Sequence, residues 1–111
     1  MFFHLAKIAL KSLFSKPATR RYPFEVREAY KHTRGQIAIE INQCIYCGIC
    51  QRKCPTAALA VDRQAKSWTI DRLRCISCRA CVGVCPKSCL TMKNSYTKPS
   101  LNRRKETFKN A

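Results

Sequence analysis

Acidic residues are scarce in this chain of 111 residues, which has 6 Asp and Glu against 22 Lys and Arg and a formal net charge of +16. Such an excess of positive charge favours an anionic partner, whether an acidic protein, lipid headgroups or nucleic acid. The charge is spread along the whole chain and marks no single site. We expect no nucleic-acid partner, because no groove-reading motif accompanies the charge.

Long apolar runs are also absent. No run approaches the roughly 18–20 residues that span a bilayer, and the start of the chain lacks the pattern of a secretory signal peptide. The sequence therefore predicts a soluble, peripheral or assembly-buried protein in a reducing cytoplasm.

The number of cysteines is odd, at 9, which argues against a disulfide framework.

Motifs of enzymatic catalysis are missing as well. The chain has no Ser-His-Asp or Cys-His arrangement, no phosphate-binding loop and no HExxH motif. His4 and His32 are isolated in the sequence. We therefore predict that the chain is not an enzyme on its own.

The strongest positive signal is a repeated cysteine motif. Each copy reads C-x2-C-x2-C-x3-C-P, and the second copy begins 31 positions after the first. The first copy supplies Cys44, Cys47, Cys50 and Cys54, and the second supplies Cys75, Cys78, Cys81 and Cys85. Two similar halves predict a domain with pseudo-twofold symmetry.

This motif is typical of bacterial ferredoxins with two [4Fe–4S] clusters, in which the fourth cysteine of each run ligates the other cluster. The proline that follows disfavours helical geometry at that cysteine, so its thiolate can turn toward the neighbouring cluster. The rule gives cluster 1 the ligands Cys44, Cys47, Cys50 and Cys85. It gives cluster 2 the ligands Cys75, Cys78, Cys81 and Cys54.

Zinc is the competing metal. Structural zinc takes four thiolate or imidazole ligands, usually from paired C-x2-C units. It has no use for the third and fourth cysteines of each run, so two [4Fe–4S] clusters are the better prediction. The ninth cysteine, Cys89, lies outside both motifs, and we expect a small buried thiol near a cluster.

The pattern around the cysteines predicts an α+β ferredoxin-like domain with short hairpins and helices over residues 36–93. Ile37, Ile39 and Ile41 alternate as in a half-buried strand. A hairpin is expected with arms at 59–61 and 68–70. Short helices are expected at 49–53 and 80–84.

Three further segments are predicted outside this domain: an amphipathic helix over 1–16, a basic extended linker over 17–35 and a basic polar tail over 94–111. On a helical wheel, one narrow polar face of the first segment carries His4, Lys7, Lys11 and Ser15. The remaining surface is apolar, which suits a membrane interface or a groove between subunits.

Several segments resemble a known family. They are FSKPATRRYPFE (14–25), TRG (33–35), CIYCGICQRKCPTAAL (44–59) and IDRLRCISCRACVGVCPKSCLTM (70–92). Together they resemble the F subunit of Ech-type energy-converting [NiFe] hydrogenases. They are also similar to the equivalent subunits of other membrane-bound hydrogenases and formate hydrogenlyase, and to the dicluster subunit I of complex I. The resemblance covers residues 1–98, and its specific part is PATRRYP, since many ferredoxins share the cysteine motifs.

The resemblance implies an electron-transfer subunit on the cytoplasmic side of the cell membrane. Reduced acidic ferredoxin would donate electrons, which would pass through both clusters to the small hydrogenase subunit and the nickel–iron site of the large subunit. There protons become hydrogen, and other complex I-like subunits couple this reaction to ion translocation. Residues 1–21 would lie at the membrane surface.

Two other interpretations remain open. One is the equivalent subunit of a different complex I-like assembly, linked to formate, carbon monoxide or a quinone. The other is a freestanding basic ferredoxin with two [4Fe–4S] clusters. Carriers of that type are typically acidic, whereas this chain is strongly basic.

Overall fold

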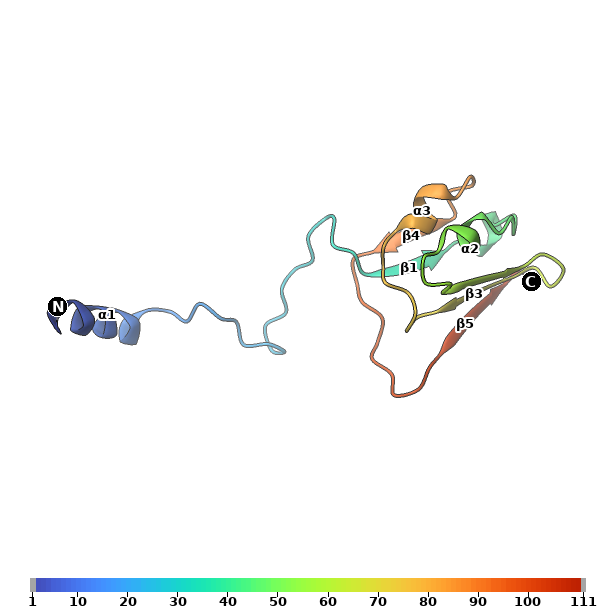
Figure 1. The fold of residues 1–111 in the computed structure, drawn as a ribbon. Helices are drawn as coiled ribbons and strands as arrows, with labels where there is room; N and C mark the ends of the chain where they lie inside the picture. Colours follow the sequence, from blue (N-terminus) through green and yellow to red (C-terminus); the bar gives the residue numbers. More distant parts are fainter. Residues whose placement is uncertain (1, 111) are drawn as a thin grey trace.

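The computed structural model describes residues 2–110, so residues 1 and 111, the outer ends of the predicted helix and tail, lie outside the described residues. The molecule is elongated, with extents of 75 × 28 × 22 Å. Helix α1 (Phe2–Phe14) lies at one end of a long irregular segment, and all the other elements gather at the opposite end (Figure 1). The helix stops just before Pro17, since proline disfavours helical geometry in the residue ahead of it.

The clustered elements follow the repeat of the sequence. In chain order they are β1 (Gln36–Ile39), the 3-10 helix η1 (Ile41–Gln43), α2 (Ile49–Lys53), β2 (Leu59–Asp62), β3 (Ser67–Asp71), α3 (Ala80–Val84), β4 (Leu90–Lys93) and β5 (Lys105–Lys109). Both short helices and the hairpin form where the sequence predicts them. The first strand is shorter than its alternation suggests, because Ile41 begins η1.

The strands form two small sheets, and both contain antiparallel pairs only. In the first sheet β1 pairs with β4, so that Ile39 faces Leu90. In the second sheet β3 is central, with β2 on one side and β5 on the other. The first sheet therefore joins the start of the first cysteine repeat to the end of the second.

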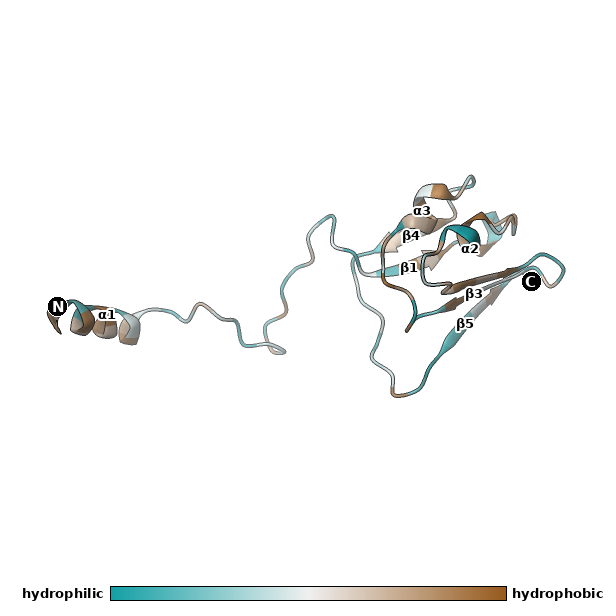
Figure 2. Ribbon diagram, in the orientation of Figure 1, coloured by the Kyte–Doolittle hydropathy of each residue, from teal (hydrophilic) through white to brown (hydrophobic). Residues whose placement is uncertain are grey.

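Strand β5 lies within the segment predicted as a basic polar tail, for which the sequence indicated no strand. It pairs with β3 in a register that sets Phe108 opposite Trp68, and the two rings are 5.8 Å apart. The strand is mostly hydrophilic (Figure 2), yet Glu106 and Phe108 are half-buried while their neighbours are exposed. A single aromatic at the right register and one ion pair are weak signals in a polar sequence, which is why this strand was missed.

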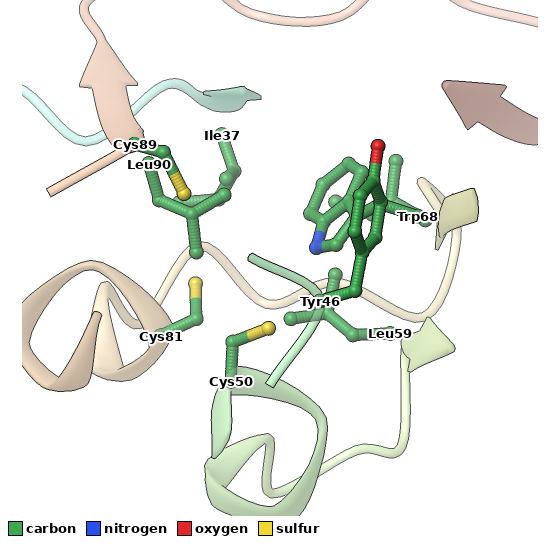
Figure 3. Packing of buried hydrophobic residues seen from close by; sticks show 9 residues of the cluster. Ile37, Tyr46, Cys50, Leu59, Trp68, Cys81, Cys89 and Leu90 are labelled. Carbon is green, nitrogen blue, oxygen red and sulfur yellow. The ribbon is translucent and has the colours of Figure 1, made fainter. Parts of the chain in front are cut away.

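The core lies between the sheets and the two short helices. Its largest fully buried side chains are Trp68, Ile37 and Ile70. Cysteines from both halves, Cys50 and Cys81, belong to the same cluster of buried residues (Figure 3). The hydrophobic core and the cysteine motifs are therefore parts of one structure.

Candidate metal centres

The eight motif cysteines surround two separate cavities. The first is lined by Cys44, Cys47, Cys50, Cys85 and Cys89 among its cysteines. The second is lined by Cys54, Cys75, Cys78 and Cys81 among its cysteines. Each cavity thus takes three cysteines from one motif and the last cysteine of the other, which is the grouping that the ferredoxin rule predicts for the ligands.

The two ligand loops have the same backbone conformation. Left-handed residues occur in pairs 31 positions apart, as at Tyr46 and Ser77 or Gly48 and Arg79. Gly48 (φ 75°, ψ 5°) precedes α2 and Arg79 (φ 66°, ψ 7°) precedes α3. Glycine adopts this conformation without strain, whereas Arg79 holds it with a side chain. The repeat in the sequence is therefore also a repeat in the backbone.

The last cysteine of each motif leaves its helix in an extended conformation. Cys54 has φ −72° and ψ 117°, and Cys85 has φ −72° and ψ 116°. The proline after each one disfavours helical geometry there, as the sequence predicts. This turn is what brings each cysteine to the cavity of the other half.

Backbone hydrogen bonds cross between the halves at matching positions. The Glu40 N–H donates to the Cys89 carbonyl oxygen, and the Asp71 N–H donates to the Ala58 carbonyl oxygen, each at 2.8 Å. Both acceptors follow the fourth cysteine of a motif, by four positions. Each of these hydrogen bonds therefore joins one half to the other close to the cysteine that reaches the opposite cavity.

Side-chain hydrogen bonds join each ligand loop to a residue outside the motifs. Arg63 in the hairpin turn donates to the carbonyl oxygens of Tyr46 (3.2 Å) and Cys47 (2.8 Å). The Ser77 hydroxyl donates to the Gly35 carbonyl oxygen at 2.7 Å. The first loop is therefore held by the hairpin, and the second by the residue just before β1.

Burial sets the ionisation of the innermost thiols. It raises the pKa of Cys50, although the neighbouring Trp68 indole acts to lower it. Burial also raises the pKa of Cys81 to about 11, and the nearby Cys75 adds to the rise. Only a cationic group among these sulfurs would make their thiolates favourable at neutral pH.

The thiols of Cys54 and Cys85, which reach the cavity of the other half, are easier to ionise than those of Cys50 and Cys81. Burial acts to raise the pKa of Cys54, but hydrogen bonds outweigh it and lower the pKa, the first of them from the Ala58 N–H at 3.3 Å. The pKa of Cys85 is lowered in the same way, against the effect of burial, by hydrogen bonds from Cys89. Backbone and side-chain donors are therefore already directed at these two sulfurs.

Cys89 is buried beside the first cavity, as the sequence predicts. Its sulfur lies 3.3 Å from that of Cys85, and burial together with Cys85 raises its pKa to about 12. Such a thiol stays protonated at neutral pH, which fits a donor to Cys85 better than a metal ligand.

The aromatic residues Trp68 and Tyr46 form one wall of the first cavity. Within residues 2–110, neither the Trp68 indole nitrogen nor the Tyr46 hydroxyl has a hydrogen-bond partner. Both atoms are buried, and buried polar groups are normally paired. The second cavity has Ile37 in its lining, at the position that matches Trp68 in the repeat.

The isoleucines of the ligand loops line the two cavities but are also open to solvent. Ile45 is 54% exposed and Ile76 is 62% exposed. Each side chain therefore contributes to a cavity wall on one side and meets solvent on the other. Sequence reasoning missed the contributions of Tyr46 and Arg63, and only the matching of Ile37 with Trp68 in the repeat could have indicated a difference between the two cavities.

The arrangement of the thiols fits a cluster. Among residues 2–110, no three His, Cys, Asp or Glu side chains converge closely enough to hold a single metal ion. A [4Fe–4S] cluster takes four cysteine thiolates around a larger body, so its ligands must line a cavity and need not meet at a point. The mostly apolar walls and the donors to Cys54 and Cys85 suit such a cofactor.

Comparisons with known proteins agree with this chemistry. Residues 43–89 match the family model described as "4Fe-4S dicluster domain". Together with the cysteines around the two cavities, this match defines the class: the protein is a carrier of two [4Fe–4S] clusters.

Longer chains of known complexes are similar to this one. NAD(P)H-quinone oxidoreductase subunit I from the chloroplast of Adiantum capillus-veneris is 39% identical over 110 residues, covering 91% of this chain and 66% of the relative. The subunit I of Microcystis aeruginosa is also 39% identical, covering 86% of this chain and 55% of the relative. The chain thus spans less than two thirds of these relatives.

A solved structure is similar as well. It is a chain of the membrane-bound sulfane sulfur reductase, described as an archaeal respiratory membrane complex, with a TM-score of 0.73 and 32% sequence identity. The match covers 86% of this chain and 54% of that one. Within residues 2–110, no helix is both long and apolar enough to cross a membrane.

Proposed function

We propose that this protein is the electron-transfer subunit of a membrane-bound, complex I-like assembly. The observation that carries the proposal is the pair of cysteine-lined cavities in a chain similar to subunit I and to a chain of an archaeal respiratory membrane complex. Bound [4Fe–4S] clusters supply one-electron transfer. The chain's own part is to hold the clusters, exclude water from the core side and tune their potentials.

The ligand assignment is part of the proposal. Cluster 1 is bound by Cys44, Cys47, Cys50 and Cys85, and cluster 2 by Cys75, Cys78, Cys81 and Cys54. The cysteine lining of the two cavities supports this grouping. The paired backbone conformations and crossed hydrogen bonds support a pseudo-twofold axis between the two halves.

The exposed side chains of α1 support attachment to a larger assembly. In the described part of the chain this helix has no buried residue, and its exposed apolar side chains include Phe2, Phe3, Leu13 and Phe14. Uncovered apolar surface of this size is unfavourable in water. We propose that residues 1–21 lie at the cytoplasmic surface of the membrane or in a groove beside it, with their basic side chains near anionic headgroups.

A finer proposal is that the assembly is an energy-converting [NiFe] hydrogenase. Its support is the resemblance of residues 14–25 and 33–35 to the F subunit of that family. Acidic ferredoxin would then donate electrons at the basic surface of this chain, where complementary charge speeds the encounter. The small and large hydrogenase subunits would accept them and reduce protons.

The second candidate is a complex I-like assembly with a different substrate, such as a quinone, formate or carbon monoxide. The named relatives favour it, since they are subunits of quinone oxidoreductases. A freestanding basic ferredoxin is the third candidate. It explains the two clusters, yet it gives no role to the apolar side chains of α1.

Purification from the native host separates these candidates. An affinity tag after residue 111 should bring down a membrane complex in mild detergent, and mass spectrometry should find a nickel–iron large subunit in it. A complex without that subunit would contradict the hydrogenase and favour the second candidate. A cluster-containing species that elutes at the 12.8 kDa of the chain alone would refute membership of any assembly.

A further inference from the structure

The two cluster cavities differ at one pair of matching positions. Trp68 and Ile37 are related by the 31-residue repeat, and both are almost fully buried, at 0% and 1% exposure. Trp68 lines the first cavity and Ile37 lines the second. The first cavity therefore has a polar hydrogen in its wall at a place where the second has only hydrocarbon.

This polar hydrogen is unused within the described residues. The Trp68 indole nitrogen is buried and has no partner among residues 2–110. An unpaired buried donor destabilises the folded state, so a protein that keeps one usually has a partner for it in the functional state. No other Trp is present in the sequence, and this one lies in the wall of a metal centre.

The indole nitrogen of Trp68 is oriented toward Cys50, one of the cysteines assigned to cluster 1. In Figure 3 the nitrogen lies on the edge of the Trp68 ring nearest the Cys50 thiol. Cys50 belongs to the same cavity lining and the same buried cluster of side chains. The Tyr46 hydroxyl is also buried, but in the same view it is at the far end of its ring from the sulfurs.

We propose that the Trp68 N–H donates a hydrogen bond to the sulfur of Cys50 or to a neighbouring sulfide of cluster 1, and thereby raises the reduction potential of cluster 1 alone. The inference rests on the cluster assignment proposed above. Reduction adds one electron to the cluster and changes no covalent bond. A donor at the sulfur stabilises the more negative, reduced form more strongly, which makes that form easier to reach.

Strand β5 also packs against the indole. Phe108 packs on Trp68, and the backbone of β5 is hydrogen-bonded to the strand that carries Trp68. Trp68 is thus a positioning and tuning residue whose ring is fixed by the C-terminal strand. It does not touch any substrate and needs no motion to act.

The experiment uses the full chain with both clusters in place, and EPR-monitored redox titration as the readout. Trp68→Phe keeps an aromatic ring and removes the N–H, so cluster 1 should become harder to reduce while cluster 2 is unchanged. Because this hydrogen bond is stronger to the more negative, reduced cluster, its loss should change the reduction equilibrium of cluster 1 about tenfold, equal to about 59 mV for a one-electron couple.

Two further measurements test the inference even if Trp68→Phe folds poorly. Replacing the single tryptophan by its benzothiophene analogue preserves the ring shape and also lacks the N–H, so it should reproduce the shift. In the unmodified chain, tryptophan labelled with 15N at the indole should show hyperfine coupling to reduced cluster 1. Tyr96→Phe is the matched control, since it removes a hydroxyl from an exposed aromatic ring that lines neither cluster cavity and should leave both potentials unchanged.

The inference is overturned if the indole nitrogen shows no coupling to cluster 1, if the analogue leaves its potential unchanged, or if both clusters shift equally. A failure of the ligand assignment is recognised separately. In that case Cys54→Ser alters the signal of cluster 1 and not that of cluster 2, whatever Trp68 does.

Discussion

Arg72 binds Glu106 through two nitrogen atoms, with Nε 2.9 Å and Nη2 2.7 Å from the same carboxylate oxygen. The third contact of its guanidinium is the Ile37 carbonyl oxygen, at 2.6 Å. One arginine side chain therefore connects the end of β3, the first strand β1 and the last strand β5. It makes the C-terminal segment part of the domain.

This relationship predicts that β5 stabilises the cluster-binding core. Phe108→Ala removes the ring that packs on Trp68 and should destabilise the folded chain by about 1–2 kcal/mol, less than for a fully buried ring. Hydrogen exchange of the amides of β3 and β5 measures the effect. Lys109→Ala, at an exposed position of the same strand, is the control, and equal effects of the two variants would contradict the packing role.

Asp71 and Arg103 form a second ion pair, with 2.6 Å between Oδ2 and Nη2. Burial acts to raise the pKa of Asp71, but the hydrogen bond and charge of Arg103 outweigh it and lower the pKa. A lowered pKa in the folded state adds stability above the ordinary value of about 3.9 and loses it as the pH falls through the folded value. We expect exchange protection of β5, corrected for intrinsic rates, to stay constant from about pH 8 to pH 5.

Arg103→Gln tests the same pair from the other side. It should lower the protection of β5 throughout that range and return the pKa of Asp71 toward its ordinary value. A loss of protection in the unmodified chain near pH 6 would show that another titrating group controls the docking of β5.

The crossing of ligands gives the sharpest prediction about the clusters. Cys54→Ser should damage cluster 2, although Cys54 belongs to the first motif, and Cys85→Ser should damage cluster 1. EPR of the reduced chain distinguishes the two clusters by their separate signals. If Cys54→Ser altered cluster 1 and spared cluster 2, the proposed ligand sets would be wrong.

Gly35 allows no side chain. A Cβ atom there would lie 2.3 Å from the Lys93 carbonyl oxygen and 2.4 Å from that of Ser95, so the backbone would have to move. Gly35→Ala should therefore destabilise the chain by about 1–3 kcal/mol, measured as a lower midpoint of thermal cluster loss. Gly83→Ala is the control, since it meets no atom within 4 Å and should be neutral or stabilising in helix α3.

Arg63 predicts a difference in the lability of the two clusters. Its hydrogen bonds to the Tyr46 and Cys47 carbonyl oxygens hold the first ligand loop only. Arg63→Gln should speed the loss of cluster 1 to an iron chelator about fivefold, the equivalent of about 1 kcal/mol, and leave cluster 2 unchanged. Lys66→Gln, also an exposed basic residue of the hairpin turn, should alter neither rate.

The parts of the structure that could be predicted from the sequence are those determined by a regular local pattern of residues. The cysteine spacing and the following prolines predicted both short helices and the division of the cysteines between two cavities. Alternating apolar residues predicted the hairpin. In each case a local pattern is enough, because the residues that determine the element are its immediate neighbours.

The parts that were missed depend on contacts between distant residues. Strand β5 is held by the contact of Phe108 with Trp68 and by the ion pair of Glu106 with Arg72. Both partners lie more than 30 positions earlier, and no periodicity in the tail predicts these contacts. The tether from Arg63 to the first loop likewise joins a turn to a loop through one long side chain. The exposure of Ile45 and Ile76 is likewise not readable from the sequence, because apolar character alone does not decide which side of a loop is buried.

The hydrogen bond from Ser77 to Gly35 gives the irregular segment a mechanical role. Gly35 ends that segment, and its carbonyl oxygen is bound directly to the loop that contains Cys75 and Cys78. A pull transmitted along residues 15–34 would therefore reach the loop of cluster 2 before that of cluster 1. The two clusters differ not only in their walls but also in how closely each is linked to the segment that carries the distant helix.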